Sequence, residues 1–251
     1  MKAHLAAVAL LLFAAFGLNA QAQERAAAAA EASASAVTVV ELYTSQGCFS
    51  CPRANRLVRQ FTRDHNVLAL TFPVGYWDYL GWADTFARPE FVDRQRLYSR
   101  ALHFRAPYTP QLIIDGARQV SAASWDLSRA VFDEVRTDAV NAPPSPRITL
   151  RRMGNDVARV EVSRGAHAGQ PADIWFVSYD PGPLTVLITR GENANRRVTH
   201  YNLVQRIVRA GEWNGEATWF ERAQCRPECA VLVQEPNGGP ILAAAFTQQS
   251  N

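Results

Sequence analysis

The stretch Val37–Pro52, VTVVELYTSQGCFSCP, decides the fold that the sequence predicts. It opens with β-branched residues typical of a strand, breaks at Gln46-Gly47, and leads through Cys48 and Cys51 into a run with helical spacing. A strand, a tight turn and a helix that begins at a Cys-x-x-Cys pair form a redox arrangement. Free backbone N–H groups at a helix start favour a thiolate, so we expect Cys48 to be the nucleophile and Cys51 the resolving thiol.

The run from Leu42 to Cys51 also resembles the active-site strand and turn of glutaredoxins and thioredoxin-like proteins. Together with the later motif YWDYLGW at 76–82, it is similar to a family of exported bacterial proteins of unknown function (DUF1223), whose fold is thioredoxin-like. The resemblance extends from about Val37 to near the C-terminus. It implies a thioredoxin-like fold with a Cys-x-x-Cys of the glutaredoxin or thioredoxin type, and it brings no biochemical activity with it.

A second motif, Thr109-Pro110, runs directly into the apolar residues Gln111–Ile114. It resembles the cis-proline loop of thioredoxin-like proteins. In that family the loop faces the Cys-x-x-Cys, and the residue before the proline pairs with the substrate chain. The resemblance therefore implies that Pro110 joins the two cysteines as a catalytic residue and that Thr109 binds substrate against Cys48.

The loop Gly75–Trp82, GYWDYLGW, holds four aromatic residues in eight positions. It follows the second predicted strand, at the sheet edge where ligand sites of open α/β sheets gather. We interpret Trp77, Asp78 and Trp82 as substrate-binding residues in a wall beside Cys48. Aromatic side chains that only cap a core are an equally weighted alternative.

Three acidic residues near these motifs are candidates for moving protons. We expect Asp78 and Asp84 to orient the aromatic loop through hydrogen bonds, which we favour over proton transfer to the thiols. Glu41 lies in the first predicted strand, upstream of Cys48. A buried Glu41 could serve as a proton relay, whereas an outward-facing Glu41 paired with an arginine is the slightly favoured alternative.

Periodic patterns predict the order β-α-β-α-β-β-α over residues 37–140, followed by a proline-rich linker, NAPPSP, at 141–146. Short alternating runs then predict an all-β, sandwich-like domain at 147–247. Its polar segment Gly191–Arg197 reads as a solvated connection, with a recognition loop as the less favoured alternative. The predicted fold class is α/β, a thioredoxin-like domain followed by a smaller all-β domain. The expected strands of the second domain are 147–152, 157–163, 174–179, 184–190, 200–208, 216–220, 230–234 and 241–246.

Residues 1–22 have the basic start, short apolar run and small-residue cleavage pattern of a secretory signal peptide. Residues 23–36 are almost all Ala, Ser and Glu and read as a disordered tether. We therefore expect a periplasmic or secreted protein that makes no membrane contact once the signal is cleaved. Disulfides persist there, so Cys225 and Cys229 are expected to form a structural bridge. A relay of electrons to or from Cys48 is the alternative.

The net charge of +3 is too small and too scattered to indicate a nucleic-acid partner. Lys2 is the only lysine, and we attribute the excess of arginine to compositional bias. The sequence thus predicts an exported thiol–disulfide oxidoreductase that acts on protein or peptide thiols and needs no cofactor. The alternative is a copper(I)-handling or non-catalytic interaction protein on the same scaffold. Its candidate histidine ligands, at no fixed spacing, are His65, His103 and His200.

Overall fold

The computed structural model describes residues 37–140, 145–154, 156–166 and 171–247. The predicted signal peptide at 1–22, the tether at 23–36 and linker residues 141–144 lie outside the described residues. None of the helices in the described ranges has the length and apolar character that a membrane span requires.

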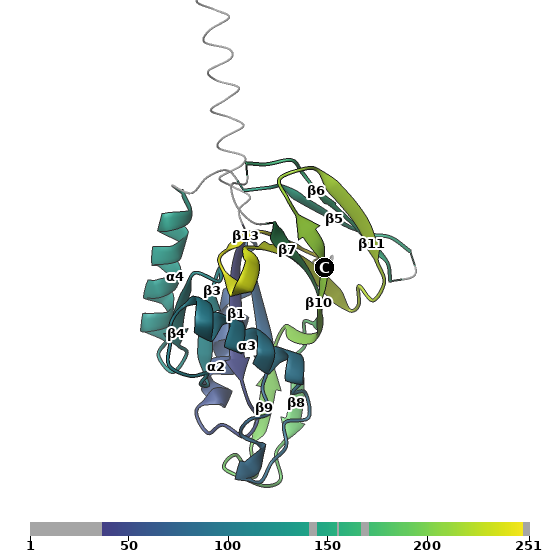
Figure 1. Ribbon diagram of the computed structural model, residues 1–251. Coiled ribbons are helices and arrows are strands. Elements are labelled where there is room, and N and C mark those ends of the chain that lie inside the picture. Colours follow the sequence, from purple (N-terminus) through teal and green to yellow (C-terminus); the bar gives the residue numbers. More distant parts are fainter. Residues whose placement is uncertain (1–36, 141–144, 155, 167–170, 248–251) are drawn as a thin grey trace, which may run out of the picture. The chain divides into compact units, whose positions relative to one another are not determined.

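The described chain contains a few helices among many strands (Figure 1). The helices are α2 (Cys51–Phe61), α3 (Pro89–Ala101) and α4 (Trp125–Val140), with short 3-10 turns η1 (Asp78–Leu80) and η2 (Pro236–Gly238). The strands of the first half are β1 (Thr38–Thr44), β2 (Val67–Pro73), β3 (Gln111–Ile114) and β4 (Arg118–Ser121). Those of the second half are β5 (Ile148–Arg152), β6 (Ala158–Val162), β7 (Ala172–Asp180), β8 (Leu184–Leu187), β9 (Arg197–His200), β10 (Leu203–Trp213), β11 (Thr218–Arg222), β12 (Glu228–Gln234) and β13 (Ile241–Phe246).

One mixed sheet of eight strands, in the order β13-β12-β7-β10-β2-β1-β3-β4, dominates the fold. β2 pairs in parallel with both β1 and β10, and the other neighbours are antiparallel. The sheet therefore combines strands from both predicted domains. The predicted fold class, a thioredoxin-like α/β domain followed by a smaller all-β domain, is wrong, because the structure is mostly β and built on this single large sheet.

The two halves of the sheet meet where β2 lies beside β10, with Leu203 opposite Thr71. Thr71 donates its backbone N–H to the carbonyl oxygen of Asn202 at 2.9 Å and its hydroxyl to that of Tyr201 at 2.7 Å. The side chain of Asn202 donates to the carbonyl oxygen of Ala69 at 2.7 Å. Few residues of β2 and β10 pair directly, and side-chain hydrogen bonds from Thr71 and Asn202 add to the contact between the two strands.

Side chains alternate along β1, so each face of the sheet has its own core. Val40 and Leu42 pack with the apolar faces of α2 and α4. Val39 and Tyr43 point to the other face and pack with Phe91 and Tyr98 of α3, in a cluster that also takes in residues of β7, β10 and β12. α2, which begins at the Cys-x-x-Cys, therefore lies on the face opposite α3.

Two smaller β elements complete the fold and lie at opposite ends of it (Figure 1). The sheet β11-β6-β5 packs its apolar residues against those of β7 and β12. The hairpin β8-β9 lies alongside α2, where the side chain of Asn55 donates to the carbonyl oxygen of Thr199 at 3.1 Å. This hairpin therefore belongs to the surroundings of the cysteine motif, although β8 begins 133 residues after Cys51 in sequence.

Candidate functional site

Cys48 and Cys51 form a disulfide at the start of α2. Cys51 is the first residue of the helix and is fully buried, whereas Cys48 is 6% exposed and is followed by Phe49, which is 59% exposed. The hydroxyl of Ser50 lies 3.6 Å from the sulfur of Cys48 and makes no capping bond to the helix. Cys48 is thus the less buried residue of the pair, and no side chain caps the N–H groups at the helix start.

The aromatic loop closes over the turn that precedes the cysteines. The indole N–H of Trp82 donates to the side-chain oxygen of Gln46 at 2.8 Å. Gly47 lies so close to Trp77 that a Cβ at this position would sit 3.2 Å from the Trp77 carbonyl oxygen. The indole N–H of Trp77 in turn donates to the hydroxyl of Thr109 at 2.7 Å. The structure therefore brings the predicted aromatic residues and the Thr-Pro motif to the same turn.

The Thr109–Pro110 peptide bond is cis, and Pro110 is buried. β1 and β3 are antiparallel with Tyr43 opposite Gln111. Thr44, the last residue of β1, and Pro110, the residue before β3, therefore lie at the same end of the two strands. This is the end from which the chain continues from β1 to Cys48. The roles of Thr109 and Pro110 toward a substrate stay predictions.

Asp84 and Asp78 make the orienting hydrogen bonds that we expected of them. Asp84 accepts the backbone N–H of Gln46 at 2.7 Å and that of Phe86 at 2.9 Å, and Asp78 accepts the backbone N–H of Asp84 at 3.1 Å. Burial raises the pKa of Asp84 from 3.8 to about 6; the bonds from Gln46 and Phe86 offset part of this rise, and Asp78 adds to it. Asp84 thus holds the turn before Cys48 in place.

Glu41 is 1% exposed and lies on the α3 face of the sheet. Arg94 donates two hydrogen bonds to the carboxylate of Glu41, from Nη2 at 2.6 Å and from Nε at 3.0 Å. The hydroxyls of Tyr43 and Tyr98 also donate to it. Burial raises the pKa of both tyrosines well above 10.0, so they stay protonated donors. Glu41 is therefore buried and also paired with an arginine, on the face of the sheet opposite the helix that carries Cys51.

Sequence reasoning missed Asn193 as a part of this site. Its side-chain amide is fully buried and donates hydrogen bonds of 2.9 Å to the carbonyl oxygens of both Gln46 and Cys48. Two residues earlier, Gly191 has a φ of +75° and approaches the aromatic loop, where a Cβ would lie 3.0 Å from the carbonyl oxygen of Leu80. Every residue of the segment Gly191–Arg197 except Asn193 is exposed, as predicted for a solvated connection, while Asn193 and Gly191 also contact the cysteine turn and the aromatic loop.

A buried polar group lies beside the first turns of α2. The hydroxyl of Thr44 donates to the side-chain oxygen of Asn55 at 2.7 Å, and the amide nitrogen of Asn55 lies 3.4 Å from Nδ1 of His200. Nε2 of His200 is buried and has no hydrogen-bond partner among the described residues. Burial lowers the pKa of His200 from 6.5 to about 4. His200 is therefore neutral at physiological pH.

The second cysteine pair, Cys225 and Cys229, forms a disulfide, as predicted. Both residues are fully buried in the cluster that joins β5 and β6 to β7 and β12. Within the described ranges, no group of three or more His, Cys, Asp and Glu residues is arranged to hold a metal ion. His65 and His103 are exposed and lie in the turns after α2 and α3. No observation in the described structure therefore favours the copper alternative.

Comparison with known proteins finds a family model and a solved structure that are similar to the chain. No curated protein sequence matches it. A crystal structure of a protein from Agrobacterium tumefaciens, determined by the Northeast Structural Genomics Consortium, is similar, with 28% sequence identity and a TM-score of 0.72 over 86% of this chain and 98% of that one. The family model described as "Protein of unknown function (DUF1223)" matches residues 39–234. The chain therefore belongs to the DUF1223 family.

Proposed function

We propose that the protein is an exported thiol–disulfide oxidoreductase that acts on protein or peptide thiols through the Cys48–Cys51 couple. One observation carries the proposal. The disulfide lies at the start of α2, and Cys48, at 6% exposure, is the less buried residue of the pair, whereas Cys51 is fully buried. This order suits a pair in which one sulfur meets the partner and the other completes the exchange.

In the reducing direction, the Cys48 thiolate attacks one sulfur of a partner disulfide. A Cys48–partner bond forms, the partner's S–S bond breaks, and the other partner sulfur leaves as a thiolate. The Cys51 thiolate then attacks the Cys48 sulfur, so that the Cys48–Cys51 bond forms and the second partner thiolate leaves. Two electrons pass from the dithiol to the partner, and the reverse sequence oxidises a partner dithiol.

The surroundings of Cys48 support this chemistry. The uncapped N–H groups at the start of α2 favour the thiolate, and α2 carries no acid in its first turn to oppose them. Hydrogen bonds from Asn193 and to Asp84 hold the turn before Cys48 in one geometry. We assign Trp77, Trp82 and Thr109 to the wall that a partner chain would meet, with Pro110 behind them.

The two disulfides support export of the protein to an oxidising compartment. Structural disulfides persist in oxidising surroundings such as the periplasm or the outside of the cell. Cys225–Cys229, buried away from the cysteine turn, is compatible with export to such a place. We propose that this second pair is structural.

An exchange assay tests the proposal. The protein is reduced, freed of reductant and mixed with a peptide disulfide, and the release of peptide thiol is followed. We expect wild type to react and Cys48→Ser to lose the reaction. A folded Cys225→Ser/Cys229→Ser variant is the matched control and is expected to react like wild type. Equal rates for wild type and Cys48→Ser would refute the proposal.

The same variants separate this function from copper handling. Tight copper(I) binding that needs Cys48, Cys51 and a histidine, without exchange by wild type, would favour the copper alternative. Exchange that depends on Cys48, with no such binding, favours the oxidoreductase.

A further inference from the structure

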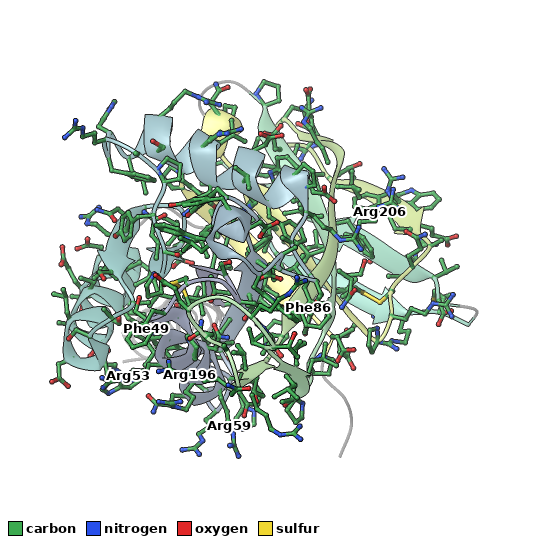
Figure 2. All side chains as sticks on the ribbon, turned by 90° about the horizontal axis from the view of Figure 1, so that it is seen from below. Phe49, Arg53, Arg59, Phe86, Arg196 and Arg206 are labelled. Carbon is green, nitrogen blue, oxygen red and sulfur yellow. A yellow bond between two sulfur atoms is a disulfide. The ribbon has the colours of Figure 1, made fainter. Side chains whose placement is uncertain are left out.

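Four arginines surround the exposed side of the cysteine motif. They enclose, together with Phe49, Ser50 and Pro52, a hollow of about 590 Å³. We call them the arginine surface; Arg53 and Arg56 come from α2, Arg196 from the end of the β8–β9 connection, and Arg197 from the start of β9. Phe49, Arg53 and Arg196 lie close together on one side of the molecule (Figure 2).

No acidic side chain among the described residues neutralises the charges of this surface. None of the four guanidinium groups takes part in an ion pair between described residues, whereas arginines elsewhere pair with acids, as Arg118 does with Glu134 and Arg129 with Asp133. Arg196 instead lies over the exposed ring of Phe49, with 4.5 Å between its guanidinium carbon and the ring centroid, and donates to the side-chain oxygen of Asn193. A concave, positively charged surface therefore lies over Phe49, Ser50 and Pro52, the residues that adjoin the two cysteines in sequence.

The chemistry of these groups defines what would fill the hollow. Guanidinium groups pair with carboxylates through two parallel hydrogen bonds, and an exposed aromatic ring offers an apolar contact within the same hollow. A partner in exchange with Cys48 must also carry sulfur, which nucleic acids and lipid headgroups do not. An extended peptide with acidic residues next to its cysteine meets all three demands.

We propose that the substrates of the Cys48–Cys51 couple are peptide segments with acidic residues close to the reacting cysteine, bound by the arginine surface. This inference rests on the proposed exchange function and specifies its substrate class. The positive surface raises the local concentration of acidic chains and orients their cysteine toward Cys48.

The test compares three peptide disulfides of equal length, with Glu, Gln or Lys at the positions that flank the cysteine. The second-order rate constant for reaction with the reduced protein is measured at low and at high salt. The test variant is Arg53→Gln/Arg56→Gln. The control is Arg151→Gln/Arg206→Gln, which removes the same charge from exposed positions on β5 and β10; Figure 2 shows Arg206 well away from Phe49.

For wild type and the control we expect the rate constant to be largest for the Glu peptide, smaller for the Gln peptide and smallest for the Lys peptide. At low salt the Glu peptide should react roughly three- to tenfold faster than the Gln peptide. The ratio should fall toward one at high salt and in Arg53→Gln/Arg56→Gln. Exchange that needs Cys48 but gives a ratio near one in wild type would overturn the acidic-substrate inference and leave the proposed function standing. Arginine-dependent binding to phosphatidylglycerol vesicles together with that ratio would assign the surface to a membrane instead. Absence of Cys48-dependent exchange with every peptide would overturn both.

Discussion

The side-chain amide of Asn193 donates a 2.9 Å hydrogen bond to the backbone carbonyl of Cys48, across 145 residues of sequence. A second bond of the same length reaches the carbonyl of Gln46. One buried side chain from the β8–β9 connection thus holds both ends of the turn that leads into the Cys48–Cys51 disulfide. The second half of the chain is part of the cysteine site. We therefore expect that removing the bonds from Asn193 destabilises the cysteine turn.

Asn193→Ala should destabilise the protein by about 1–3 kcal/mol, because the carbonyl oxygen of Gln46 loses the Asn193 donor and that of Cys48 keeps only the bond from the Cys51 N–H. The free energy of unfolding in urea measures this effect. Glu192→Ala, an exposed change in the same loop, is the matched control and should stay close to wild type. Equal stabilities of the two variants would show that the bonds from Asn193 do not hold the turn.

Glu41→Gln should be among the most destabilising single changes. It leaves the guanidinium of Arg94 buried without its carboxylate, which costs about 3–5 kcal/mol. Asp133→Asn breaks an exposed pair with Arg129 and should cost no more than about 1 kcal/mol. Urea unfolding of both variants checks the contrast, and similar losses would mean that the Glu41–Arg94 pair contributes no more than a surface pair.

Asp84 should make stability fall as the pH rises through about 6. Its folded pKa lies above its usual value of 3.8, so the folded state holds the proton more tightly and is favoured at low pH. Asp84→Asn loses one accepting oxygen at every pH but does not titrate. The free energy of unfolding of this variant, relative to that of wild type, should therefore rise by up to roughly 3 kcal/mol between pH 4 and pH 7.

Unfolding free energies across that pH range test the role of Asp84. Asp93→Asn changes an exposed acid and should show a flat difference from wild type. A flat difference for Asp84→Asn as well would contradict the raised pKa.

His200 should make the protein less stable as the pH falls, which is opposite to the effect of Asp84. Its folded pKa of about 4 lies below the usual 6.5, so protonation favours the unfolded chain and wild type loses stability as the pH falls from 6.5 to 4. His200→Gln should lack this loss, with a gain relative to wild type of up to roughly 3 kcal/mol at the acid end. His65→Gln, at an exposed histidine, should show no such trend. If the unfolding free energies of His200→Gln and wild type change with pH in the same way, the lowered pKa of His200 is contradicted.

Local structure was predictable from the sequence in both halves of the chain. The strand and helix patterns around the cysteine motif correspond to β1 and α2, and the alternating runs beyond residue 147 correspond to most of the strands from β5 to β13. One predicted strand, 200–208, is divided in the structure between the end of β9 and the start of β10. These successes rest on side-chain periodicity, which is a local property.

The way the strands combine was not predictable. β10 joins β2 through a single pair of opposed residues and through side chains such as Asn202, and nothing in a local pattern marks such a partner. The run Val67–Val74 indicates a buried strand but not which strand lies on its other edge. The apparent boundary at the proline-rich segment therefore suggested two domains where the sheet is continuous.

The candidate site was predictable where its residues form a motif. The cysteine pairs and the aromatic loop carry recognisable spacing or composition, and the structure brings Trp77, Trp82 and Thr109 to the turn before Cys48. Asn193 and the arginine surface carry no such signal, because a polar loop and scattered arginines look the same whether they face solvent or a site.

The most direct test of the account is the identity of the sulfur that joins the partner. Cys51→Ser, reduced and mixed with a peptide disulfide, cannot complete the exchange and should accumulate a mixed disulfide. We predict that mass spectrometry after digestion finds the peptide on Cys48, and that Cys48→Ser forms little or no adduct under the same conditions. An adduct on Cys51 of Cys48→Ser at an equal rate, or no adduct in either variant, would contradict it.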